Sequence, residues 1–520
     1  MRKIAKNAFW VLLLVTFFLS LGYVNSVLAD EGGSDNTTES SDDSEAVFDD
    51  GDSEEGFDEE DGDGFETVSV NMDEIKSSSG ERELFVISGF VKEDLAYSHT
   101  WEEPDLSKIR TILNLTLDLD LSAEWKAKLN WNGFYDYAYS HIGRDSFTDE
   151  TLESSETESE VRDLYLDGSP ATWLNLRFGR QIIAWGESEA MQVTDMANPR
   201  DMRELGMVDI EDARLAVAAT KLSLLLDSWQ INFAAIHEIR GNKMAGAGSE
   251  FDALRGIRTV FTVEDEEVPE SETSNTEYLL RIFKSFNGGD VGLVWADVYE
   301  DAFYLELTRI QLSGAQPQLS MTPRHNRIQS VGLSGNIVSG SWLFKAEAAK
   351  KSKVALARNF TDIQVQLQQA LPELQATAIT SGNPNISEKD IPIEVWDEKA
   401  VQQLVLGLEY QGLEDLSLSL EVGAEQIVDY EENLRSKEVT TQAALMLTYT
   451  ALNDTLDVQL FWIHFTDDNG EVVRVNLGYD LIDALTVSGG FIIYEASNAE
   501  AIVYSLRNSD RLFAAVKYSF

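Results

Sequence analysis

The sequence predicts an all-β fold, a transmembrane antiparallel β-barrel of about 18 strands, from three observations. Apolar and polar residues alternate with a period of two in many segments from Leu84 to the C-terminus, as expected where one strand face meets lipid. After the N-terminal segment, no apolar run reaches the roughly 18 residues of a spanning helix, although 43% of the chain is hydrophobic and 10% is aromatic. The 520 residues also exceed what one soluble core usually holds.

The C-terminal segment LFAAVKYSF is predicted to be the last strand. One face carries Leu512, Ala514, Val516 and Tyr518, and the other carries Phe513, Ala515, Lys517 and Ser519. This alternation and the final Phe520 resemble the C-terminal signature that the assembly machinery of bacterial outer-membrane β-barrels reads. We therefore expect Tyr518 and Phe520 to act as an assembly signal, with that machinery as a partner.

A cleaved signal peptide is predicted over residues 1–29. Arg2, Lys3 and Lys6 precede an apolar run over residues 8–21, and Val27-Leu28-Ala29 allows cleavage before Asp30. The run is shorter than the roughly 20 residues that a membrane anchor needs. The chain has no cysteine, which excludes a lipoprotein anchor, a disulfide framework and thiolate metal sites.

An acidic tail and linker are predicted over residues 30–83. Residues 30–66 contain 18 Asp or Glu and no Lys or Arg, a composition typical of disorder. The formal net charge is −51, and leaving out the three basic residues of the signal and these 18 acids still gives −36. This acidity makes nucleic acid an unsuitable partner. Divalent cations at the acidic loops, outer-membrane lipid and lipopolysaccharide are the partners we expect.

Residues 84–520 are predicted to form the barrel. The clearest strand covers residues 113–121, where leucine at each odd position alternates with Asn, Thr or Asp. The next strand puts Trp125, Ala127, Leu129 and Trp131 on the lipid side, and Lys126, Lys128, Asn130 and Asn132 on the other side. Polar residues at this density on the second face indicate a water-filled lumen.

Short turns are predicted at residues 287–290, 411–415, 452–454 and 480–484. Trp125, Trp229 and Trp342 each follow a short turn on the apolar face, as in an interfacial aromatic girdle, which assigns the short turns to the periplasm. Strand counting gives 18, with 16 as the alternative, and an even count leaves both ends of the barrel in the periplasm.

Long loops are predicted at about residues 140–160, 186–212, 241–276, 300–325 and 353–400, and we expect them to face outward. In the last loop, Thr361 is a candidate cap for a helix that begins at Asp362 and ends at Pro372. This helix either folds into the lumen as a constriction or packs on the barrel rim.

The densest polar motif covers residues 177–204. Arg177 lies on the lumen face of a strand whose lipid face carries Leu174, Leu176 and Phe178. The candidate pore-lining or constriction residues are Arg177, Arg180, Glu187, Asp195, Arg200, Asp201, Arg203 and Glu204. Opposed charges in a loop inside a pore set a transverse field and a size limit. The alternative is that these charges pair with one another and brace the loop against the wall.

The same motif carries a family resemblance. GRQ (Gly179–Gln181), WGES (Trp185–Ser188), the Asn198-Pro199 pair and Asp201 resemble the large Gram-negative outer-membrane β-barrel family catalogued as domain of unknown function 1302, as do residues 327–351 and the terminal Phe520. The resemblance implies a barrel with a transport role and no settled substrate. More distantly, the chain resembles alginate-export and siderophore porins.

Enzyme chemistry is not expected, and neither is a cofactor, a metal site or a catalytic residue. The five histidines are scattered without metal-ligand spacing, and GESEA (Gly186–Ala190) departs from the G-x-S-x-G elbow at its last position. Two functions fit a multi-pass barrel of the cell outer membrane with a periplasmic tail. The first is a porin-like channel for an unidentified solute. The alternative is a structural or docking barrel that is plugged by its loops and binds a periplasmic partner through the tail.

Overall fold

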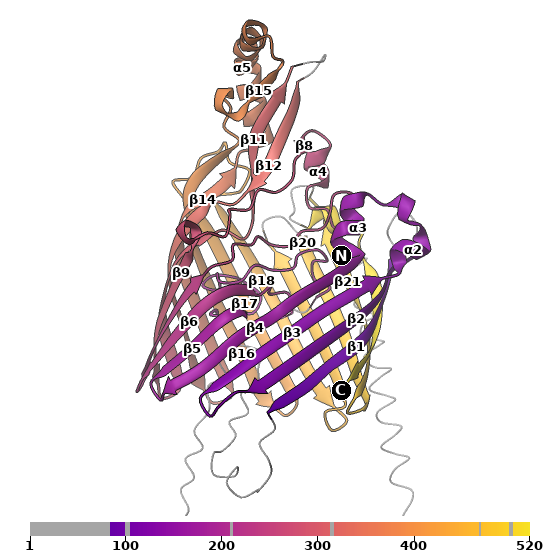
Figure 1. Ribbon diagram of the computed structural model, residues 1–520, viewed down its shortest axis with the longest axis vertical. Helices are drawn as coiled ribbons and strands as arrows, with labels where there is room; N and C mark the ends of the chain where they lie inside the picture. Colours follow the sequence, from indigo (N-terminus) through magenta and orange to yellow (C-terminus); the bar gives the residue numbers. More distant parts are fainter. Residues whose placement is uncertain (1–83, 99–104, 209–211, 313–316, 467–469, 499–502) are drawn as a thin grey trace, which may run out of the picture. The chain divides into compact units, whose positions relative to one another are not determined.

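The computed structural model describes residues 84–98, 105–208, 212–312, 317–466, 470–498 and 503–520. Within these ranges, 18 strands form one antiparallel sheet that closes into a barrel, since the last strand pairs with the first (Figure 1). The barrel strands are β1 (Phe85–Ser98), β2 (Asp105–Asp120), β3 (Trp125–Asp136), β4 (Thr157–Ala171), β5 (Leu174–Gln181), β6 (Val217–Leu226), β7 (Trp229–Ile236), β9 (Glu277–Phe286), β10 (Gly289–Tyr299), β13 (Arg327–Ser339), β14 (Trp342–Ala357), β16 (Trp396–Leu413), β17 (Leu416–Val428), β18 (Val439–Ala451), β19 (Leu456–Phe465), β20 (Gly470–Ile482), β21 (Leu485–Ala496) and β22 (Arg511–Ser519). The predicted count of 18 is confirmed. The predicted signal peptide and acidic tail lie outside the described residues.

The strands alternate between an exposed outer face and an enclosed inner face, as the sequence predicts. On β17, Leu420 and Val422 are exposed, whereas Ser419 and Glu421, which alternate with them, are buried. The outward face of β22 likewise exposes its apolar residues, Leu512, Val516 and Tyr518. An outer belt of large apolar side chains is the surface that a lipid bilayer would cover.

Short turns join the strands at one end of the barrel, at the four predicted positions. Tight reversal requires positive φ there, for example 57–62° over the three residues Leu452–Asp454. Trp125, Trp229 and Trp342 are the first residues of β3, β7 and β14, directly after short turns. Trp229 and Trp342 are exposed, as the girdle prediction requires.

The barrel closes at this same end through Gly89 and Phe520. The Gly89 N–H donates to the Phe520 carbonyl and the Phe520 N–H donates to the Gly89 carbonyl, both at 2.9 Å. A Cβ on Gly89 would collide with the carbonyl oxygen of Asn114 on β2 and would lie 3.2 Å from the Phe520 ring. Glycine is therefore required where three strands and the terminal aromatic ring converge.

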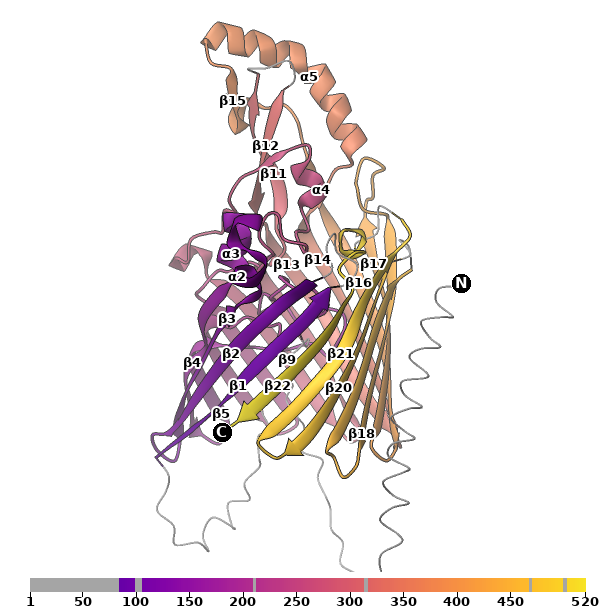
Figure 2. The same ribbon diagram turned by 90° about the vertical axis from the view of Figure 1, so that its right-hand side faces the viewer.

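The long connections lie at the opposite end (Figures 1 and 2) and contain the helical segments. These are α2 (Ala138–Ile142), η1 (Arg144–Ser146), α3 (Asp149–Ser155), α4 (Arg255–Arg258), η2 (Thr273–Asn275), α5 (Phe360–Ser381), η3 (Glu388–Asp390) and η4 (Tyr504–Leu506). A second sheet, in the order β15 (Asn385–Ser387), β11 (Tyr304–Gln311), β12 (Gln318–Arg324) and β8 (Thr262–Val263), lies beyond the barrel strands (Figure 2). Of the helices described, none is long and apolar enough to cross a membrane.

Two predictions about the helix in the last long loop are wrong. Helix α5 begins after Asn359, whose side chain accepts from the Asp362 N–H at 2.8 Å, and it continues through Pro372 to a left-handed C-cap at Gly382. Ile363 and Leu374, on either side of the proline, are buried against the core of the second sheet. This packing offsets the hydrogen bond that proline removes. The helix therefore covers the second sheet and does not enter the lumen.

The closure point gives a test of folding. Gly89→Ala forces the Asn114 carbonyl away and weakens the β1–β22 pairing, and deletion of Phe520 removes both terminal hydrogen bonds. Both variants should lower the fraction of heat-modifiable, folded protein after refolding in detergent, measured by gel electrophoresis. Gly256→Ala is the control, because a Cβ there meets nothing within 4 Å. Equal folded fractions in all four proteins would contradict the role of this contact.

Candidate constriction loop inside the barrel

The connection between β5 and β6, residues 182–216, folds into the barrel. Ile183, Trp185 and Met196 are buried in a core formed by inward side chains of β6, β7, β9, β10, β13, β14, β16 and β17. Val294 and Ala296 of β10 belong to this core and are 0% exposed. The prediction of a polar inner face thus fails for the part of the wall that packs against Ile183, Trp185 and Met196, because the inner face is apolar there.

The side chain of Asn198 joins the two ends of the first part of the loop, residues 183–198. Its side-chain oxygen accepts from the Ile183 N–H at 2.6 Å, and its amide nitrogen donates to the carbonyls of Leu215 at 2.7 Å and Gln181 at 3.3 Å. Asn198 is buried, so these bonds form away from water, where an unpaired polar group is costly. One side chain therefore joins both ends of the segment 183–198.

Two wall carboxylates hold the far side of this segment. Glu347 of β14 accepts from the backbone N–H groups of Ser188 at 2.7 Å and Thr194 at 2.9 Å, and from the Thr194 hydroxyl at 2.7 Å. Glu421 of β17 accepts from the Ser188 hydroxyl at 2.6 Å and from the backbone N–H groups of Glu189 and Ala190 at 2.9 and 3.1 Å. The loop thus reaches from β5 to the strands β14 and β17.

Both carboxylates are enclosed, with Glu347 at 2% and Glu421 at 0% exposure. Hydrogen bonds to a charged acceptor contribute about 1.5–3 kcal/mol each to stability.

Inward glycines leave space for the loop beside them, because a Cβ on Gly332 would lie 2.9 Å from the Thr194 methyl group and a Cβ on Gly423 would collide with the Met191 sulfur. The wall residues and the loop are therefore complementary in shape and in hydrogen bonding.

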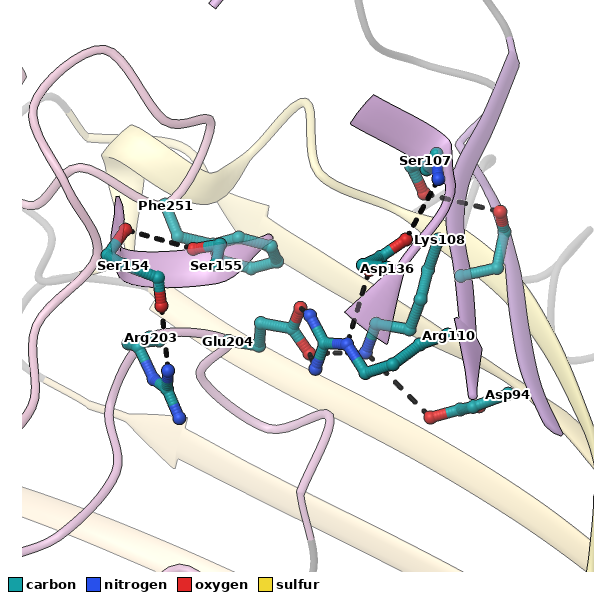
Figure 3. A network of polar contacts seen from close by, with 12 residues as sticks. Asp94, Ser107, Lys108, Arg110, Asp136, Ser154, Ser155, Arg203, Glu204 and Phe251 are labelled. Atoms are coloured by element: carbon teal, nitrogen blue, oxygen red, sulfur yellow. Dashed lines mark hydrogen bonds and ion pairs between the residues drawn. The ribbon is translucent and has the colours of Figure 1, made fainter. Parts of the chain in front are cut away.

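A second part of the loop reaches β2, β3 and β4. Glu204 pairs with both Lys108 and Arg110 of β2 (Figure 3), and the Arg110 guanidinium also bonds Asp136 at 3.2 Å. Burial alone would raise the pKa of Glu204, but Arg110 and Lys108 outweigh burial and hold this pKa well below its usual range. Because the pKa is lower in the folded than in the unfolded chain, the charged carboxylate stabilises the fold at pH values above the ordinary carboxyl pKa. This contribution is lost only as the pH falls through the depressed pKa. Glu204 should therefore stay charged and keep the loop braced in mild acid.

Arg203 braces the loop beside Glu204. Its guanidinium pairs with Asp201 of the loop and with Glu158 of β4. It also donates to the Ser154 carbonyl at 2.7 Å (Figure 3). Leu205, which follows Glu204, accepts a hydrogen bond at its carbonyl from the Tyr494 hydroxyl of β21. The loop therefore contacts the wall on β2–β4 and β21 as well as on β14 and β17.

The other candidate residues on the loop also have charged partners. Glu187 pairs with Arg281 of β9 at 2.7 Å, and Asp195 pairs with Arg214 at 3.0 Å and with Arg200 at 3.5 Å. The charges of the loop thus pair across it and with the wall, which favours the bracing interpretation. A role in selectivity stays a prediction.

Arg177 and Arg180 lie on β5. Arg177 bonds Asp167 at 2.7 Å and its guanidinium carbon lies 4.6 Å from the Tyr165 ring centre. Arg180 shares its parity with the exposed Phe178, yet it pairs with Glu160 at 3.4 Å and Glu238 at 3.2 Å. Gly179, at φ 126°, breaks the regular alternation between them.

Sequence reasoning missed the residues that hold the loop. Glu347, Glu421, Lys108 and Arg110 lie on strands far from the motif, and Asn198 was noted only as part of a resemblance. A usable signal was the inward parity of Glu347 between Ala346 and Ala348. In the described part of the chain, no group of three His, Cys, Asp or Glu could hold a metal ion. Divalent cations at the loops therefore stay a prediction.

A family model described as a protein of unknown function (DUF1302) matches residues 90–520. The chain belongs to this family. The segment 177–204 and the hairpin 327–351, which carried the family resemblance, meet in space through Thr194, Glu347 and Gly332. The family motif thus contains both the loop and part of the wall that holds it.

Solved structures similar to this one cover most of the chain at low sequence identity. OccAB3 of Acinetobacter baumannii is 9% identical, with a TM-score of 0.46 over 84% of this chain and 99% of that chain. OccK8 (OprE) of Pseudomonas aeruginosa is 8% identical, with a TM-score of 0.46 over 85% and 99%. The outer membrane channel DcaP of A. baumannii is 12% identical, with a TM-score of 0.37 over 84% and 97%. No curated protein matches the chain.

The loop anchors give a test that uses the absence of native cysteine. Met191→Cys places a thiol at a position that is 5% exposed. Adding Glu347→Gln and Glu421→Gln removes both charged acceptors, so a water-soluble thiol reagent should label the cysteine at least about tenfold faster. Glu425→Gln, on β17 but bonded to Gln403 and not to the loop, should leave the rate unchanged. Equal rates in all backgrounds would show that the two carboxylates do not hold the loop.

Proposed function

We propose that this protein is a porin-like channel of the Gram-negative outer membrane for a solute that its chemistry does not yet specify. The observation that carries the proposal is a closed barrel, apolar on its outside, with a long loop fixed inside it. Toward the short turns, the inner face carries polar side chains, both uncharged ones such as Asn114 and Asn232 and charged ones such as Lys345 and Glu409. A wall of this kind suits a water-filled passage below the loop.

The orientation follows from the two ends of the barrel. We infer that the short turns and the closure at Gly89 and Phe520 face the periplasm, and that the second sheet and α5 face outward. Strand β1 begins at the short-turn end, so an N-terminal tail would leave the barrel on the periplasmic side. The function proposed is passive passage and requires no catalytic group.

The loop would set the narrowest part of the passage. Glu189 is half exposed and bonds Lys345 at 3.2 Å, and Lys345 also bonds Glu409 at 3.0 Å. On the other side of the loop, Arg177 faces Asp167 on the wall of β4 and β5. A solute that passes between these pairs would experience a transverse field, the basis of selection by size and charge in general channels.

The second candidate function is a barrel plugged by this loop and used as a docking platform. The reach of the loop to both Glu347 and Lys108 favours it, because contacts on separate walls suit a permanent plug. The two candidates differ in conductance, which a channel shows and a plug does not.

The full chain inserted into planar lipid bilayers should conduct ions in defined single-channel steps. Replacing Arg200 and Arg203 with Ala removes two positive charges and leaves Asp195, Asp201 and Glu158, so the reversal potential in a salt gradient should shift toward cations. Heat-modifiable mobility checks that the double variant folds. A folded parent that does not conduct would refute the channel proposal in favour of the plug. A folded variant with an unchanged reversal potential would show that these arginines act only as braces.

A further inference from the structure

A groove of about 600 Å³ lies on the outer face of the barrel over β13, β14, β16, β17 and β18. Its outward lining residues are Val331, Leu333, Ala348, Lys350, Gln402, Leu404, Ala424, Gln426 and Val439. The strand alternation points all of them away from the lumen. The groove therefore belongs to the surface that lipid would cover, and it has no part in the passage.

Small and large side chains alternate across one row of paired residues and shape the groove. Leu333 pairs with Ala348, Ala348 pairs with Leu404, and Leu404 pairs with Ala424. Leu333 and Leu404 are 56% and 47% exposed, so they project beside the two alanines. Leu404 thus forms a ridge with an alanine-floored furrow on each side.

Both furrows end at a polar row on the side of the long loops. In the next row, Lys350 pairs with Gln402 and Gln402 pairs with Gln426, and all three side chains are exposed. From the short turns up to this row, the described outward residues of β14, β16 and β17 are otherwise uncharged. A lysine on the lipid face costs about 2–4 kcal/mol at the bilayer midplane and about 0–1 near its surface. The row therefore marks the height at which lipid headgroups begin.

We propose that this groove binds the lipid A part of lipopolysaccharide, with acyl chains in the two furrows and a phosphate on the Lys350 ammonium. The proposal rests on the outer-membrane insertion proposed above. The Gln402 and Gln426 amides supply donors and acceptors to the sugar headgroup. Acyl chains match the apolar furrows, and an anionic phosphate matches the one outward charge in this region of the described strands.

A second copy of the chain fits this surface less well. A two-fold interface places the same patch on both subunits, so two Lys350 ammonium groups would approach one another without a counter-charge. A lipid phosphate supplies that charge. The dimer is retained as an outcome of the test.

The test is native mass spectrometry of the full chain in detergent, titrated with diphosphorylated lipid A, with its dephosphorylated form and with phosphatidylglycerol. Lys350→Gln should weaken binding of diphosphorylated lipid A roughly tenfold and leave the dephosphorylated form unaffected. Ala348→Phe fills one furrow and should weaken binding of both forms. The control is Lys284→Gln, an exposed lysine near the short turns that lies 5.3 Å from the Trp229 ring centre. It should bind as the parent does.

Three outcomes would overturn the proposal: Lys350→Gln binding as the parent does, phosphatidylglycerol binding as tightly as lipid A, or a dimer that Ala348→Phe dissociates. Heat-modifiable mobility confirms that each variant folds. Conductance of the same preparations separates the two proposals. A barrel that binds lipid A through Lys350 without conducting would refute only the channel, and a conducting barrel without this binding would refute only the lipid site.

Discussion

Peptide groups that enter the interior of a barrel must find hydrogen-bond partners there, and this requirement shapes the whole inner structure. The loop of residues 182–216 carries many backbone N–H groups into the lumen, where apolar residues such as Val294 surround it. Glu347 and Glu421 accept from the backbone N–H groups of Ser188, Glu189, Ala190 and Thr194. Because an unpaired buried amide is costly, the loop conformation and these two wall positions depend on each other.

The same dependence explains why the family motif is split between distant parts of the chain. Asn198 fixes the base of the loop, and Glu347 on β14 fixes its far side. Arg203 and Glu204 then fix the second part against β2 and β4. These anchors hold the loop from several strands at once, so the passage proposed beside it would keep a constant size and charge pattern.

The barrel could be predicted from the sequence because lipid on one face and the lumen on the other impose a period of two on every strand. That period predicted the 18 strands, the turns and the girdle tryptophans. Contacts between distant segments have no such period. Arg180 was expected to line the pore although it shares its parity with Phe178, and a period of two does not reveal that Gly179 breaks the alternation there. Pro372 suggested a helix end because the sequence does not show the second sheet that stabilises α5 on both sides of it. The charged residues of the loop could be found in the sequence, but their partners on β2, β4 and β9 could not be read from a linear pattern.

The most direct measurement of the central claim is a crosslink between the loop and the wall. The chain lacks native cysteine, and the Met191 sulfur lies against Gly423 of β17. Met191→Cys with Gly423→Cys should form a crosslink with a short thiol-reactive reagent in the folded barrel, whereas Met191→Cys with Ala515→Cys on β22 should not. The account predicts that the crosslinked barrel keeps the single-channel conductance it had before crosslinking, because the loop already occupies this position. A folded double variant that fails to crosslink, or whose conductance changes once crosslinked, would contradict it.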